Sequence, residues 1–303
     1  VEIVGLSDQQ FNTTTGLMGF TDDLFVRAGK WNVFDVTVGR FQAWEIANHY
    51  GMGLDENTLE REGANIQQGS KHPPAAYGLN YFWDRTDAKL GNVAVHVYPT
   101  DFLRGELLGQ LGAGALGINP ISTNFRASGI FDVGIIKVKA GYELGKAIPQ
   151  ADGAAGGRRR NGFGVALQLV LDPYIEGGAA FARGYDDIWN SLTDKYDDNA
   201  SNTVTGISGF INGRLYKDLI LGVGALNGHW ENLAKDERPG AVHEGEVDFD
   251  RHFQAFAALQ YSFWDAFYIK AVGSYAHWRH QDKASTPFAN TSVGGRLRLM
   301  VLF

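Results

Sequence analysis

Apolar and polar residues alternate along most of the chain from Phe125 onward, in segments that come in pairs. A very short connection of turn-forming residues joins the two segments of each pair, and a long polar stretch follows the second. The end of the chain, Gly294 to Phe303, alternates in the same way up to a terminal aromatic residue. This pattern predicts antiparallel hairpins, formed by residues 125–133 with 135–146, 164–171 with 174–185, 204–216 with 219–230, and 253–263 with 267–278.

The first part of the chain is less regular but contains the same kind of hairpin. Segments 25–31 and 34–44 meet at Asn32, and we expect 93–98 to join 103–111 through a short connection. We interpret the long stretch 45–92 mainly as a loop folded into a channel, although 77–83 could form another strand. Segment 1–6 is shorter than a spanning strand, and this abrupt start suggests that barrel sequence is missing before Val1. The count is about 14 strands.

Short turns at one end and long polar loops at the other are typical of outer-membrane β-barrels, whose short turns face the periplasm. The mean hydropathy of −0.20 is normal for strands that alternate between lipid and water, and no window approaches the roughly 20 apolar residues of a spanning helix. We therefore predict an all-β fold, a single transmembrane antiparallel β-barrel domain over residues 1–303 in the bacterial outer membrane. The predicted loops are 149–161, 186–202, 233–252 and 279–290.

Aromatic residues recur at the predicted strand ends, where they would form girdles at the two membrane surfaces. Ordinary core packing is the alternative for each residue taken singly. The candidates are Tyr174, Tyr185, Tyr216, Trp230, Trp264, Tyr268 and Trp278.

The segment from Val36 to Arg61 carries a more specific pattern. It contains Val-Thr-Val-Gly-Arg-Phe-Gln-Ala-Trp-Glu and then Gly-Met-Gly-Leu-Asp-Glu-Asn-Thr-Leu-Glu-Arg. It resembles the phosphate-selective porin O and P family, in which a strand ending Val-Gly-Gln-Phe-Lys leads into an inward-folded loop and a Glu-Arg pair. The resemblance implies a usually trimeric channel of about 16 strands, with residues 45–75 narrowing the pore. Arg40, Gln42 and Trp44 replace the family's Gln, Lys and Pro, so phosphate selectivity is not carried over.

Alternation also assigns one face of each strand to lipid and the other to water. A charge at mid-depth in lipid costs about 2 to 4 kcal/mol, so charged positions belong inside. The predicted pore-lining residues are mostly basic, although the net charge is −7. They indicate a wall that tolerates or favours small anions, with a weakly selective pore of paired charges as the equal alternative. These residues are Arg27, Arg40, Arg104, Glu106, Arg126, Asp132, Lys137, Lys139, Arg214, Lys270, Arg296 and Arg298.

Further charges lie on the loop expected to fold into the channel. Facing the basic wall, they would create a transverse field that orients dipolar solutes. Solvated surface charges, or caps of a short loop helix, are the alternative. The constriction-loop residues are Glu45, Asp55, Glu56, Glu60 and Arg61.

These patterns predict a porin, a diffusion channel for small hydrophilic solutes or ions, surrounded by membrane lipid and lipopolysaccharide, and the resemblance implies that the channel is a homotrimer. We expect no cofactor, no metal ion and no nucleic-acid partner. A barrel that serves as a sheath or adhesin is the main alternative. An outer-membrane enzyme is less favoured because no local nucleophile motif is present. Arg158, Arg159 and Arg160 are expected in a Gly-rich loop, where they could collect anions or bind lipid phosphates.

Overall fold

The structure is a computed structural model of the chain, and every regular element that it contains is a β-strand. None of the described residues forms a helix long and apolar enough to cross a membrane. The structure describes residues 2–5, 9–11, 18–20, 24–41, 44, 91–111, 121–148, 158–171, 174–190, 195–216, 218–234, 248–264, 267–281 and 288–301.

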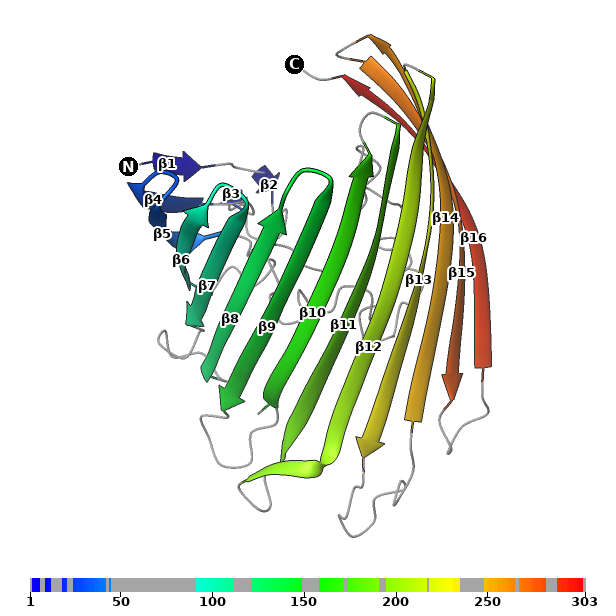
Figure 1. Cartoon of the computed structure of the whole chain (residues 1–303). Helices are drawn as coiled ribbons and strands as arrows, with labels where there is room; N and C mark the ends of the chain where they lie inside the picture. Colours follow the sequence, from blue (N-terminus) through cyan, green and yellow to red (C-terminus); the bar gives the residue numbers. More distant parts are fainter. Residues whose placement is uncertain are drawn as a thin grey trace.

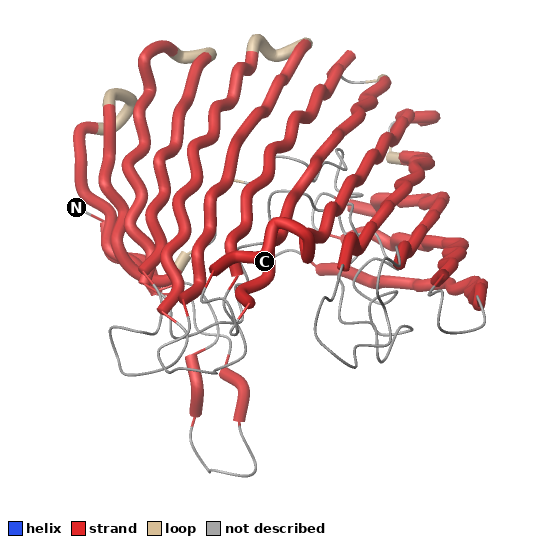
Figure 2. The backbone as a smooth tube through the Cα atoms, turned by 90° about the horizontal axis from the view of Figure 1, so that it is seen from below, coloured by secondary structure: helices blue, strands red, loops and turns tan. Residues whose placement is uncertain are grey.

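Fourteen strands form one sheet in the order β1-β4-β5 and then in sequence order to β16, with every pair antiparallel. They stand side by side in Figure 1, and Figure 2 shows how strongly the sheet curves. The predicted all-β barrel fold with about 14 strands is thus confirmed. The strands are β1 (Glu2–Gly5), β4 (Leu24–Lys30), β5 (Phe34–Arg40), β6 (Gly91–Thr100), β7 (Leu103–Leu111), β8 (Ile121–Asp132), β9 (Ile136–Ile148), β10 (Arg158–Leu171), β11 (Ile175–Asn190), β12 (Lys195–Tyr216), β13 (Leu219–Ala234), β14 (Asp248–Trp264), β15 (Phe267–Gln281) and β16 (Phe288–Val301).

Two further strands, β2 (Gln9–Phe11) and β3 (Met18–Phe20), pair only with each other and were not predicted. They are only three residues long, too short for a period of two to be recognised.

Every second connection from β4 onward has only two or three residues, and these turns share one end of the sheet, the upper edge in Figure 1. Two of them contain the positive φ angles that tight turns require, 62° at Asn32 and 81° at Gly134. Both positions were predicted as turns. We call this edge the short-turn end and the opposite edge the loop end.

At the loop end the strands are longer than predicted. Arg158, Arg159 and Arg160 begin β10 instead of lying in a loop, and the register sets Arg159 opposite Asp187 and Arg160 opposite Asp186 on β11. The predicted loops therefore had wrong boundaries. The reason is physical: beyond the lipid both faces of a strand meet water, so the apolar alternation stops while the backbone ladder continues.

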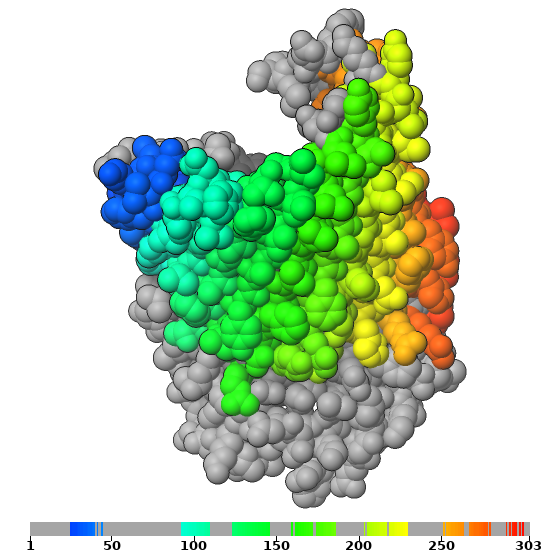
Figure 3. Space-filling view, in the orientation of Figure 1, coloured from blue at the N-terminus to red at the C-terminus, as the bar shows by residue number. Residues whose placement is uncertain are grey.

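The two faces of the sheet are inverted relative to a water-soluble protein. On β9, Tyr142 and Leu144 are 44% and 46% exposed, whereas Glu143 between them is fully buried. Similar apolar side chains are exposed on the outer surface of the neighbouring strands. Figure 3 shows these strands packed into one continuous wall. An exposed aliphatic face is favourable in lipid and costly in water.

Exposed aromatic side chains gather at the short-turn end, and Phe102 and Phe131 pack edge to face with ring centroids 5.8 Å apart. Tyr174 and Tyr216 are exposed there as predicted. The prediction for Tyr268 is wrong: it lies two residues from the buried Lys270, on the same inner face, with the ammonium 5.8 Å from its ring. Position at a strand end does not determine which face an aromatic ring occupies.

The inner face of β12 to β15 carries an apolar cluster instead of a wholly polar lining. Its members are Phe210, Ile220, Phe256, Ala258 and Val272. Each phenylalanine ring lies over a glycine of the preceding strand: a Cβ on Gly224 would be 2.5 Å from the Phe256 ring, and one on Gly178 would be 2.7 Å from Phe210. Glycine is required at both positions because any larger residue would collide with the ring.

Candidate functional site

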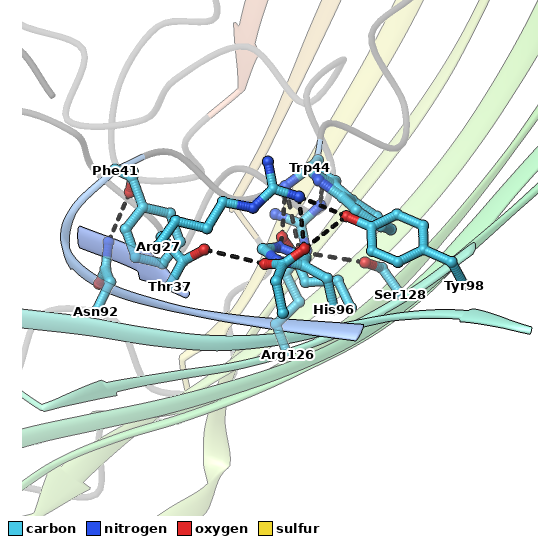
Figure 4. A network of polar contacts seen from close by, with 11 residues as sticks. Arg27, Thr37, Phe41, Trp44, Asn92, His96, Tyr98, Arg126 and Ser128 are labelled. Atoms are coloured by element: carbon cyan, nitrogen blue, oxygen red, sulfur yellow. Dashed lines mark hydrogen bonds and ion pairs between the residues drawn. The ribbon is translucent and has the colours of Figure 1, made fainter. Parts of the chain in front are cut away.

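The densest group of charged side chains lies on the inner face of β4 to β9. The strand register sets four polar residues directly opposite one another on successive strands: Asp35 on β5, His96 on β6, Glu106 on β7 and Ser128 on β8. Two residues before Ser128, on the same face of β8, Arg126 lies opposite Glu143 on β9. All six side chains are buried. Figure 4 shows His96, Arg126 and Ser128 close to Arg27 of β4 and to Trp44 of the segment after β5.

Asp35 is the acceptor for four side chains. Its Oδ2 accepts from Arg27 Nη2 at 2.5 Å and from the Tyr98 hydroxyl at 2.9 Å. Its Oδ1 lies 2.6 Å from His96 Nδ1 and 3.3 Å from Thr37 Oγ1. Arg27 also donates to the Tyr98 oxygen at 2.7 Å. A carboxylate held by this many donors can remain ionised although it is fully buried.

His96 joins Asp35 to Glu106. Its Nε2 lies 3.2 Å from Glu106 Oε2, so each ring nitrogen faces a carboxylate oxygen. Only the doubly protonated ring offers a donor to both. The Ser128 hydroxyl donates to the other oxygen of Glu106 at 3.2 Å.

Trp44 is bound to this wall through its backbone and its ring. Its N–H approaches both carboxylate oxygens of Glu106, at 3.2 and 3.3 Å, and its carbonyl accepts from Arg126. Its ring stacks on His96, with centroids 4.9 Å apart. Trp44 is where the phosphate-selective porin family usually has proline, which has no N–H to donate to Glu106.

Ion pairs complete the charge balance of this wall. Arg126 Nη1 lies 3.4 Å from Glu143 Oε1, and neither side chain is exposed. Nearer the short-turn end, Asp132 is 3.4 Å from Arg104 and 3.0 Å from Lys137. Each acid of this wall thus lies within 4 Å of a basic side chain, and the basic side chains outnumber the acids.

The opposite part of the inner face has a different charge pattern. The register aligns Arg214, Ile220, Gln260, Lys270 and Arg298 across β12 to β16, a row with three basic residues and no acid. Gln260 Oε1 has no hydrogen-bond partner among the described residues. These aligned positions therefore place three basic residues on neighbouring strands with no acid among them.

The structure brings together some of the predicted pore-lining residues and leaves others apart. Arg27, Glu106 and Arg126 belong to the buried network, while Arg104, Asp132 and Lys137 form the smaller cluster. Lys139, Arg214 and Lys270 also lie on the inner face. The side chains of Arg40, Arg296 and Arg298 are not described, and the constriction-loop residues Glu45, Asp55, Glu56, Glu60 and Arg61 lie outside the described residues. The pore-lining and constriction roles stay predictions.

The sequence-based site did not include Asp35, His96, Tyr98 or Glu143. A signal for all four was present, because Glu143 alternates with Tyr142 and Leu144, and alternation assigns it to the inner face. Asp35 also alternates with apolar residues, as do His96 and Tyr98 with Val95 and Val97. Such alternation indicates the inward face but not the partner on the next strand. The described residues contain no group of three or more His, Cys, Asp or Glu side chains that could hold a metal ion.

The chain is similar to solved structures but not to a protein-family model or a curated sequence. No protein-family model and no curated protein sequence matches the chain, so membership of the phosphate-selective porin O and P family stays a prediction. The chain is similar to OmpT, an outer membrane protein of Vibrio cholerae, with a TM-score of 0.54 and 12% identity over 88% of this chain and 76% of that one. It is also similar to a loop L8 deletion mutant of OmpT, with a TM-score of 0.55 and 13% identity over 94% and 81% of the two chains.

The antiparallel sheet, its apolar outer face and this structural likeness together define the class: the chain has the fold of an outer-membrane β-barrel. The bacterial outer membrane is accordingly its location. At such low identity the likeness extends to the fold alone.

Proposed function

We propose that the protein is a porin, a passive channel through which small hydrophilic solutes cross the outer membrane, with a preference for anions. The observation that supports this most is the segregation of the two faces, with charges inside and apolar side chains outside. Charged groups are stable inside a barrel when they are paired or hydrated, and a hydrated bore is a path for solutes. In this proposal the barrel catalyses no reaction.

The uneven distribution of charge supports the anion preference. Each acid of β4 to β9 is held in an ion pair, whereas the aligned row of Arg214, Lys270 and Arg298 contains no acid. An anion that passes between the two walls would be attracted to the basic row. The resemblance around Val36 to Arg61 makes inorganic phosphate one anion to test.

The test is conductance of the purified protein in a planar bilayer under a KCl gradient. We expect stepwise insertion, three equal closing steps for a trimer, and a reversal potential of the sign set by chloride permeation. Phosphate and a dicarboxylate, added as blockers, would identify the class of anion. A reversal potential set by potassium would contradict the anion preference, and a folded barrel without conductance would contradict the channel.

One observation favours a second candidate function. The cluster of Phe210, Phe256 and their neighbours makes part of the inner face apolar, as expected if that part of the interior is filled. A filled barrel would serve as a sheath or adhesin. The same bilayer recording separates the two functions, because a sheath gives no conductance while its barrel remains folded.

A further inference from the structure

Basic side chains follow one another across the outer face of the sheet near its loop end. The register sets Arg183 on β11, Thr205 on β12, His229 on β13, Arg251 on β14 and Arg279 on β15 in one line. The three arginines are exposed and His229 is half-buried. We call Arg183, His229, Arg251 and Arg279 the outer basic row. The positions that flank it are Phe163 on β10 and Ala289 on β16, so the whole line contains no acid.

The outer basic row lies just past the apolar surface of the same strands. On β14, alternate residues from Phe263 to Phe253 are apolar and face outward, and Arg251 is the next residue on that face. With a rise of about 3.4 Å per residue and a tilt of about 40°, Arg251 lies roughly 30 Å from Phe263 along the barrel axis. The apolar band of an outer-membrane barrel is about 25 Å tall, so Arg251 reaches the level of the lipid headgroups.

Two of the arginines are placed where like charges repel. Arg251 and Arg279 are directly opposite each other on β14 and β15, and both face outward. The Cβ atoms of such cross-strand pairs are about 4.5 to 5.5 Å apart, and like charges there are destabilising. An anion placed between the two side chains can accept hydrogen bonds from both guanidinium groups. Phosphate fits such a site, because its oxygens match the planar guanidinium fork.

We propose that the outer basic row binds the phosphate groups of lipopolysaccharide in the outer leaflet. Long loops mark the extracellular end of an outer-membrane barrel, and the row lies at that end. Phe181, Ile207 and Phe253 lie one outward position below the row, where they can pack against the acyl chains of the same lipid. The proposal concerns the lipid-facing surface and is independent of whether the barrel conducts.

The test compares binding of diphosphorylated lipid A with binding of the same lipid stripped of both phosphates. The purified protein in detergent is titrated with each, and bound lipid is counted by native mass spectrometry. We expect R251Q/R279Q to bind diphosphorylated lipid A about tenfold or more weakly than the wild type, because it loses charge-assisted hydrogen bonds. Binding of the dephosphorylated lipid should be unchanged. Heat-dependent gel mobility verifies that every variant is folded.

Two controls keep the result specific. R251K/R279K retains the charge and should keep part of the affinity, whereas Lys30→Gln removes an exposed charge at the short-turn end and should have no effect. Equal binding of diphosphorylated lipid A by R251Q/R279Q and the wild type would overturn the proposal. So would displacement of the bound lipid by inorganic phosphate at equal concentration, since that would identify a site for the free anion.

Discussion

Trp44 stacks on the imidazole of His96 on β6, with the two ring planes inclined by only 20°, and the backbone of Trp44 is hydrogen-bonded to the next two strands, β7 and β8. One residue outside the strands thus binds Glu106 on β7 and Arg126 on β8. Its attachment depends on a backbone donor and on a flat ring, and these two contributions can be separated by mutation.

Trp44→Pro should destabilise the barrel, because it removes both the N–H donated to Glu106 and the stacked ring. A buried carboxylate that loses a donor costs about 1 to 3 kcal/mol. Trp44→Phe retains the N–H and an aromatic ring and should recover most of the loss. Equilibrium unfolding by urea in lipid vesicles measures both variants. Equal stability of the proline variant and the wild type would show that the contacts of Trp44 with Glu106 and His96 do not stabilise the barrel.

Asp35→Asn should be among the most destabilising single substitutions of the inner face. The change leaves Arg27 and His96 without the buried carboxylate that both contact. Removing one partner of a buried ion pair costs about 3 to 5 kcal/mol. The matched control is Asp132→Asn, whose ion pairs with Arg104 and Lys137 are partly exposed and contribute about 0 to 1 kcal/mol. Similar unfolding midpoints for the two variants would contradict the central role given to Asp35.

Gly224→Ala should destabilise the barrel by about 1 to 3 kcal/mol, because the new methyl group would overlap the Phe256 ring. Gly273→Ala is the control, since a Cβ there meets nothing within 4 Å. Combining Gly224→Ala with Phe256→Leu should restore part of the stability lost to the collision. Thermal unfolding, followed by gel mobility, measures the stability of each variant. An unchanged unfolding temperature for Gly224→Ala would mean that the Phe256 ring does not lie over Gly224.

Lys270→Gln should weaken anion preference if the basic row faces the ion path. One unit charge near a passing ion in an aqueous bore changes its energy by up to about 1 kcal/mol, so the chloride-to-potassium permeability ratio should fall about twofold to fivefold. Lys30→Gln is the control, because Lys30 is exposed at the short-turn end. Reversal potentials measured for both variants in one gradient make the comparison. An unchanged ratio for Lys270→Gln would remove this residue from the path.

The strands were predictable because lipid imposes the same demand on each of them: alternate residues such as Tyr142 and Leu144 must be apolar. Tight turns were predictable at Asn32 and Gly134 because these turn-forming residues separate two alternating segments, and both adopt positive φ in the structure. The extensions at Arg158 to Arg160 were not, because water on both faces removes the alternation from which strands are recognised.

The buried network could be predicted only in part. Alternation shows that Asp35 and His96 face inward, but their pairing depends on the register of β5 against β6, which are separated by about fifty residues of sequence. No local pattern determines a register across such a distance. Likewise, nothing in the sequence indicates that the Phe256 ring lies over Gly224.

The phenylalanine rings that lie over Gly178 and Gly224 have a consequence for how this barrel can evolve. Positions 210 and 178, and positions 256 and 224, each share one fixed space between neighbouring strands. A side chain can be gained at either glycine only after the ring has become smaller, and at Gly178 the Leu167 backbone oxygen, 2.9 Å from the same Cβ, must also move. Among descendants of this sequence, the two members of each pair should therefore change together: a larger residue in place of the glycine should accompany a smaller residue in place of the phenylalanine on the next strand.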